Sequence, residues 1–209
     1  MKTKIDLNSW NRKEHFEFFI NFDEPFFGLT TRLDCTIAYN KSKKEGFSLY
    51  LYYLYQTIRA ANSIPNFRYR ILDGEVWEFD TIHTSTIGIR KDDTFAFTFI
   101  EYRESFEEFV MLAQKEKEAV ENSTGIRLTE NSSRIDVMHY STLPWIDFTS
   151  ISHARYYSRN DSMQKITFGK IHDEGGIKIL PFSIHAHHAL LDGKHIADYL
   201  ALLQDLLDT

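Results

Sequence analysis

Histidines gather in one short stretch near the end of the chain. Four of the nine histidines follow Ile184, namely His185, His187, His188 and His195. An imidazole titrates near neutral pH, so it can act as a general base on a hydroxyl group. A His-x-His pair can instead bind a metal ion such as zinc. The stretch therefore carries two candidate chemistries.

The strand that positions these histidines favours the first chemistry. The run from Ile177 to His187 is rich in Ile, Leu and Phe and predicts a strand buried on both faces. Because side chains alternate along a strand, His185 and His187 share one face and His188 points to the other. The chain has a single cysteine, so a third metal ligand is hard to supply and we expect no metal site. His188, which a rigid strand delivers to the turn at Asp192-Gly193, is the candidate for chemistry.

The remaining pattern predicts strands and helices that interleave. Apolar residues at helical spacing predict helices over 8–19, 49–62, 104–122 and from 192 onward. A short edge strand is expected over 1–7, a charged loop over 41–46, an irregular link over 144–160, and strands over 26–39, 67–71, 75–79, 85–90, 94–102, 134–142, 164–170 and 176–187. The four strands between 67 and 102 are expected to form a meander, with a hairpin at Asp73-Gly74.

Hairpins dominate the middle of the chain, which favours an α/β fold of the α+β type. We expect a mixed, largely antiparallel β-sheet with flanking helices. At 209 residues, with no linker or internal repeat, the chain is expected to form one domain over residues 1–209.

Composition excludes several classes of partner. The formal charge of −6 argues against broad nucleic-acid binding, which needs a basic face. No apolar run approaches roughly 18 residues, so no membrane span is expected. The lone Cys35 excludes an internal disulfide, and the N-terminus lacks an apolar signal core. We therefore expect a cytoplasmic protein.

Four segments resemble those of a known enzyme family. His187 to Gly193 resembles the His-His-x-x-x-Asp-Gly motif of coenzyme A-dependent acyltransferases. Trp10 to Phe19 resembles the Trp-x-Arg-x-x-x-Phe segment of chloramphenicol acetyltransferases. Ser141 to Phe148 is similar to their Ser-x-x-Pro-Trp-x-x-Phe, and Thr167 to Lys170 to their Thr-x-x-Lys. The segments follow the family's order over essentially the whole chain.

This resemblance implies catalytic roles. His188 would deprotonate an acceptor hydroxyl, which then attacks the thioester of acetyl-CoA in a ternary complex. Ser141 would hydrogen-bond the oxyanion, and Thr167 would assist through water. Arg12 and Asp192 would pair and support the site. By residue type alone, Arg12 would be a surface charge and Ser141 an ordinary serine at a strand end.

The resemblance also implies binding residues, partners and an assembly. Lys170 would contact the 3′-phosphate of coenzyme A, although a solvated lysine is the plainer interpretation. Phe18 and Phe19 would line the acceptor pocket. The family's fold is a two-layer sandwich, and the implied assembly is a homotrimer with each active site between subunits. The implied substrates are acetyl-CoA and chloramphenicol.

The chain departs from the family at four positions. Leu191 replaces a cysteine, Lys194 an aromatic residue, Phe19 a tyrosine and Gly46 a lysine. The change at Phe19 leaves chloramphenicol specificity open, and the change at Gly46 leaves one coenzyme A contact open. Two alternatives therefore stand beside chloramphenicol acetylation. One is an acetyltransferase for another hydroxylated metabolite or xenobiotic, and the other is a small-ligand-binding protein without turnover.

Overall fold

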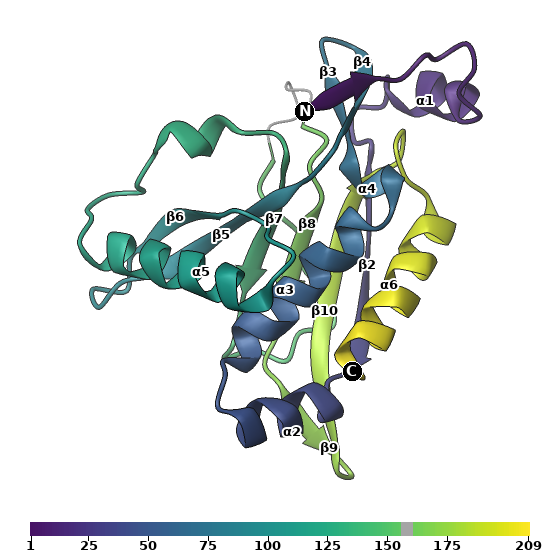
Figure 1. Ribbon diagram of the computed structural model, residues 1–209. Coiled ribbons are helices and arrows are strands. Elements are labelled where there is room, and N and C mark those ends of the chain that lie inside the picture. Colours follow the sequence, from purple (N-terminus) through teal and green to yellow (C-terminus); the bar gives the residue numbers. More distant parts are fainter. Residues whose placement is uncertain (156–160) are drawn as a thin grey trace.

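A computed structural model describes residues 1–155 and 161–209 of the chain (Figure 1). The helices are α1 (Lys13–Phe19), α2 (Thr36–Glu45), α3 (Leu49–Asn62), α4 (Pro65–Arg68), α5 (Phe106–Glu121) and α6 (Gly193–Leu207), with a 3₁₀ turn at Glu130–Ser133. The strands are β1 (Lys2–Lys4), β2 (Phe26–Asp34), β3 (Tyr69–Leu72), β4 (Glu75–Phe79), β5 (His83–Ile89), β6 (Phe95–Ile100), β7 (Val137–Thr142), β8 (Lys165–Phe168), β9 (His172–Glu174) and β10 (Ile177–His187).

The described strands form two sheets. The large sheet has the order β2-β10-β8-β7-β5-β6, with β9 paired to β10, and the small sheet has the order β1-β4-β3. Only the β5–β7 and β7–β8 pairs are parallel, while the other described pairs are antiparallel. The expected fold class, a mixed and largely antiparallel sheet with flanking helices, is confirmed.

The two faces of the large sheet carry different side chains. On β10, Phe182 and Ile184 are buried on the face where α2, α3, α5 and α6 lie, whereas Ser183 and His185 alternate to the other face (Figure 1). The register extends this division to the neighbouring strands. We call the second face the polar face and define it by six residues: His139, Ser141, Lys165, Thr167, Ser183 and His185.

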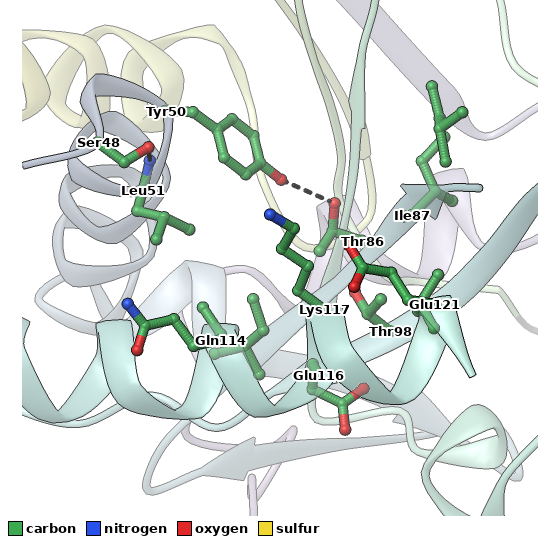
Figure 2. Close-up of a pocket in the computed structure, with 15 residues that line it drawn as sticks. Ser48, Tyr50, Leu51, Thr86, Ile87, Thr98, Gln114, Glu116, Lys117 and Glu121 are labelled. Carbon is green, nitrogen blue, oxygen red and sulfur yellow. Dashed lines mark hydrogen bonds between the residues drawn. The ribbon is translucent and has the colours of Figure 1, made fainter. Parts of the chain in front are cut away.

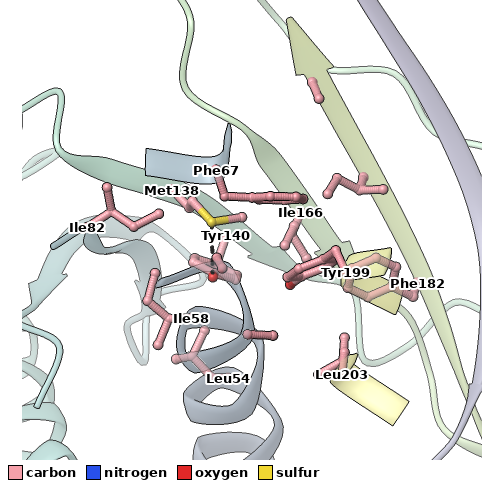
Figure 3. Close-up of a cluster of buried hydrophobic side chains, with 14 of the residues drawn as sticks. Leu54, Ile58, Phe67, Ile82, Met138, Tyr140, Ile166, Phe182, Tyr199 and Leu203 are labelled. Carbon is pink, nitrogen blue, oxygen red and sulfur yellow. Dashed lines mark hydrogen bonds between the residues drawn. The ribbon is translucent and has the colours of Figure 1, made fainter. Parts of the chain in front are cut away.

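Helices α3 and α6 seal the first face with a buried cluster (Figure 3). Tyr199 of α6 stacks on Phe67 with ring centroids 4.5 Å apart, and its hydroxyl donates to the carbonyl of Thr57 at 3.2 Å. Arg70, which is fully buried, donates to the carbonyls of Ile135 and Val137 at 2.6 and 2.7 Å. These bonds attach the small sheet to the start of β7, the strand that carries Ser141.

The expected end of the strand over 26–39 and the expected loop over 41–46 are wrong. Strand β2 ends at Asp34, and helix α2 occupies most of the segment expected to finish a strand and form a charged loop. The carboxylate of Asp34 accepts a hydrogen bond from the backbone N–H of Thr36 at 2.8 Å, and Gly46 ends the helix with φ of 79°. Helix α2 buries only Ala38 and Ser42, so its apolar pattern was too weak to predict a helix.

The expected meander is also wrong, because its strands divide between the two sheets. Strand β4 pairs with β1 and β3, whereas β5 joins β6 and β7. A hairpin pattern predicts which strands are local partners and says nothing about the sheet they enter. The irregular link expected over 144–160 contains no helix or strand up to residue 155, and its last five residues lie outside the described ranges. None of the described helices is long and apolar enough to span a membrane.

Candidate active site

His188 lies just beyond the end of β10, in an aromatic setting. Its backbone N–H donates to the carbonyl of Pro25 at 2.8 Å. Its ring stacks on Phe19, with centroids 4.0 Å apart and planes 3° apart, and leans on Phe27 at 4.5 Å. The ring nitrogen Nδ1 is buried and has no hydrogen-bond partner among the described residues. Because Nδ1 is enclosed, Nε2 is the ring nitrogen left to accept a proton from a substrate.

Arg12 connects the first helix to the turn after β10. The guanidinium is 7% exposed and donates to the carboxylate of Asp192 at 2.6 Å and to the carbonyl of His188 at 3.3 Å. Asp192 also caps α6, since it accepts from the backbone N–H of Lys194 and contacts His195. Burial acts to raise the pKa of Asp192, but the bond from Arg12 and the nearby His195 lower it to about 2. The contact predicted between Arg12 and Asp192 is therefore formed, and the carboxylate is ionised at neutral pH.

The two phenylalanines expected in the acceptor pocket occupy different surroundings. The ring of Phe19 stacks on one face of the His188 ring. Phe18 is 62% exposed and packs on Phe19 and Phe22 with centroids 5.0 and 5.1 Å away. The acceptor-binding role of both residues stays a prediction.

Ser141 and Thr167 lie side by side on the polar face. They are register partners in the parallel β7–β8 pair, and Thr167 is in turn opposite Ser183 of β10. Thr167 is fully buried and Ser141 is half-buried. His188 lies five positions beyond Ser183, a span of roughly 16 Å along the chain at about 3.3 Å per residue, so it is well separated from the two hydroxyls. One chain therefore places the predicted catalytic residues in two separate groups.

A charged and polar cluster surrounds the two hydroxyls, at positions that none of the sequence motifs includes. His139 is two residues before Ser141, and Lys165 is two residues before Thr167, so all four share the polar face. Lys165 donates to the carboxylate of Asp161 at 2.5 Å, and burial lowers the pKa of this lysine. Burial, with a smaller effect of Lys165, lowers the pKa of His139 to about 4. Alternating polar residues along 137–142 and 165–168 were the available signal.

The His-x-His pair of β10 is divided between two contacts. His187 packs on Phe26 at 5.3 Å, whereas His185 meets the ring of His153 edge-on at 4.9 Å. Within residues 1–155 and 161–209, no group of three His, Cys, Asp or Glu side chains is arranged to hold a metal ion. Lys170 follows β8 with an exposed side chain, and its backbone N–H donates to the carbonyl of Ile146 at 2.8 Å. Its predicted contact with coenzyme A stays a prediction.

A cavity lies on the helix-bearing side of the large sheet, between α3, α5 and the β5–β6 hairpin. Its volume is about 470 Å³. Thr86 and Thr98 are register partners on its floor, and the hydroxyl of Tyr50 is 3.2 Å from that of Thr86. Figure 2 shows the amino group of Lys117 pointing toward this hydroxyl pair. The sheet separates this cavity from the polar face.

Known proteins match this chain over nearly its whole length. A family model described as chloramphenicol acetyltransferase matches residues 1–204. A chloramphenicol acetyltransferase of Campylobacter coli is 31% identical, over 99% of this chain and 98% of the relative. Another, from Staphylococcus aureus, is 30% identical, over 98% of this chain and 95% of the relative.

Solved structures agree with these sequence matches. A chloramphenicol acetyltransferase structure has a TM-score of 0.91 at 33% identity and covers 99% of this chain and 100% of its own. A probable dihydrolipoamide acetyltransferase from Listeria monocytogenes is 12% identical with a TM-score of 0.62, covers 99% of this chain and 94% of its own, and shares the fold alone. The chain belongs to the chloramphenicol acetyltransferase family.

Proposed function

We propose that this protein transfers the acetyl group of acetyl-CoA to a hydroxyl of chloramphenicol. Relatives named chloramphenicol acetyltransferase are about 30% identical over nearly the whole chain. The structural observation that carries the proposal is the setting of His188. Its ring is held between Phe19 and Phe27, and Arg12 binds both its carbonyl and Asp192. This arrangement fixes an imidazole at a strand end with Nε2 available as a base.

The proposed reaction proceeds without an acyl-enzyme. Nε2 of His188 takes the proton of the acceptor hydroxyl, and the oxygen attacks the thioester carbonyl. Ser141 donates a hydrogen bond to the resulting oxyanion, a contribution whose loss costs roughly 10²–10³ in rate. The tetrahedral intermediate then breaks its C–S bond, and the imidazolium returns the proton to the departing thiolate. Thr167 assists through a bridging water.

A homotrimer with each active site between two subunits is part of the proposal. His188 lies roughly 16 Å along β10 from the strand position level with Ser141, which is too far for His188 to deprotonate the attacking hydroxyl while Ser141 of the same chain binds the oxyanion. A site assembled from His188 of one subunit and Ser141 and Thr167 of the next removes this separation. Exposed Phe18, Leu128 and Trp145 are apolar side chains that an interface would cover. One domain per subunit and a cytoplasmic location complete the proposal.

The polar face favours a second candidate, an acceptor with more hydrogen-bonding groups than chloramphenicol. His139 and Lys165 lie next to the two predicted catalytic hydroxyls. A cavity of about 110 Å³ adjoins this region, and its lining includes the polar His139 and Ser85 and the apolar Phe97 and Phe99. An acceptor with an apolar body and several polar substituents matches such a lining.

Release of free thiol from acetyl-CoA tests the proposal. We expect release with chloramphenicol or, for the second candidate, with a member of a panel of polar hydroxylated compounds. His188→Ala should lose at least 10²-fold in kcat, the typical contribution of a general base. The matched control is His15→Ala, which removes an exposed histidine of α1. Thermal shifts without thiol release for any acceptor would instead indicate a binding protein.

A further inference from the structure

The segment after β7 brings a third polar group to the catalytic hydroxyls. Nε2 of His153 lies 3.3 Å from Oγ1 of Thr167, within hydrogen-bond distance. Thr167 is fully buried, and its register partners are Ser141 and Ser183. A buried hydroxyl next to an imidazole has few other directions in which to point, so this contact controls the orientation of the Thr167 proton.

Packing holds His153 in place. Its ring meets the ring of His185 at 90° with centroids 4.9 Å apart. His185 in turn lies directly over Gly28 of β2, where an added Cβ would be only 2.5 Å from Nε2 of His185. The missing side chain of Gly28 therefore makes room for His185, and His185 supports the imidazole that contacts Thr167.

The charge state of His153 determines what it can donate. Burial is the main cause that lowers the pKa of His153 to about 4, and the neighbouring His185, Lys165 and Arg155 act in the same direction. The carboxylate of Asp161, an acidic group next to Lys165, accepts a hydrogen bond from that lysine at 2.5 Å. The imidazole is therefore neutral at neutral pH and carries one N–H.

We propose that His153 is a positioning residue whose Nε2–H donates to Oγ1 of Thr167, so that the Thr167 hydroxyl proton points to the reacting centre. A neutral imidazole with its proton on Nε2 occupies one lone pair of the hydroxyl oxygen, so the hydroxyl directs its own proton elsewhere. Thr167 then offers that proton to the oxyanion or to the bridging water from a fixed direction. The inference rests on the proposed acetyl transfer.

Steady-state kinetics with a double-mutant cycle test the role. His153→Leu should lower kcat roughly 2- to 13-fold with little change in KM, the rate equivalent of one neutral hydrogen bond. His153→Gln, whose amide reaches a similar position, should recover most of the rate. In the Thr167→Val background, His153→Leu should have no further effect, because the hydroxyl that it orients is gone. The control cycle pairs His153→Leu with Thr98→Val on the opposite face and should be additive.

The ¹⁵N NMR signals of His153 give a readout that needs no turnover. The wild type should show the tautomer protonated on Nε2, and Thr167→Val should shift this signal. Additive kinetics with Thr167→Val, the opposite tautomer, or a signal insensitive to Thr167→Val overturns the inference. If the wild type acetylates no acceptor, the proposed function fails instead, and the NMR result then reports on the contact alone.

Discussion

Arg12 and Asp192 are 180 positions apart in the sequence, and their side chains form an ion pair with 2.6 Å between Nη1 and Oδ2. The same guanidinium binds the carbonyl of His188. One side chain thus fixes three elements relative to one another: helix α1, the residue after β10, and the cap of α6. Because α1 also supplies Phe19 to the His188 ring, the pair sets both the backbone and the aromatic wall of the proposed base.

Replacement of Arg12 by methionine tests this connection. Arg12→Met keeps an apolar stem but leaves the Asp192 carboxylate without its cation, so we expect the free energy of unfolding to fall by about 1–3 kcal/mol for this partly exposed pair. The kcat should fall as well, because the His188 carbonyl loses a donor. Lys13→Met is the matched control, since the ion pair of Lys13 with Glu17 is exposed and 3.9 Å long. Equal effects of the two variants in urea unfolding would contradict a supporting role for Arg12.

The contact between Arg12 and Asp192 also shows what the sequence could predict of the site. No local pattern links residues so far apart, and only the resemblance to a family joined them. Strand alternation predicted a separation of His188 from His185 and His187, but β10 ends at His187, and Phe19 and Phe27 contact the His188 ring. The contact of His153 could not be predicted, because its segment has no periodicity and its partner, Thr167, lies on strand β8.

Local patterns predicted most elements of the fold and failed where contacts between distant segments determine the structure. The helix over 49–62 was predictable because much of its surface is apolar, and it buries nine of its residues. Helix α2 was missed because it buries only two. Register places His139 and Lys165 beside the proposed catalytic hydroxyls, and register depends on strand pairing that a single sequence does not show.

The proposed division of the site between two subunits predicts complementation between inactive variants. Ser141→Ala and His188→Ala homotrimers should each be nearly inactive. When equal amounts of the two are unfolded and refolded together, about one quarter of the sites receive an intact His188 from one subunit and an intact Ser141 from the next. We therefore expect about one quarter of wild-type activity. The control is the same two proteins mixed without unfolding, and absence of recovery after mixed refolding would place the whole site in one chain.

Three imidazoles with lowered pKa values predict that the protein loses stability in mild acid. Burial is the main cause that lowers the pKa of His139, His153 and His187 to about 4, from an ordinary value of 6.5. The unfolded chain therefore binds more protons than the folded one below pH 6.5, and stability that is complete above that pH is lost as the pH falls toward 4. We expect the free energy of unfolding to drop by about 2 kcal/mol or more between pH 7.5 and pH 5.

Urea unfolding at the two pH values measures this loss. His187→Gln removes one of the titrating groups and should make the pH dependence shallower. His15→Gln, at an exposed position, should leave it unchanged. A pH dependence that His187→Gln does not alter would show that other groups govern acid stability.

The close approach of Gly28 to the His185 ring predicts that this position, far from His188 in the chain, is sensitive to substitution. An added Cβ would meet the rigid ring of His185, with its Nε2 only 2.5 Å away, so the ring must move or β2 must shift. We expect Gly28→Ala to cost about 1–3 kcal/mol, as overpacking usually does. Because His185 supports His153, kcat should fall in the same variant. In the Thr167→Val background, the fall in kcat should disappear while the loss of stability remains.

Gly74→Ala is the control for glycine removal, since nothing lies within 4 Å of a Cβ there, although its φ of +77° makes some loss of stability expected. If Gly28→Ala keeps full activity despite the predicted clash, His185 does not support His153.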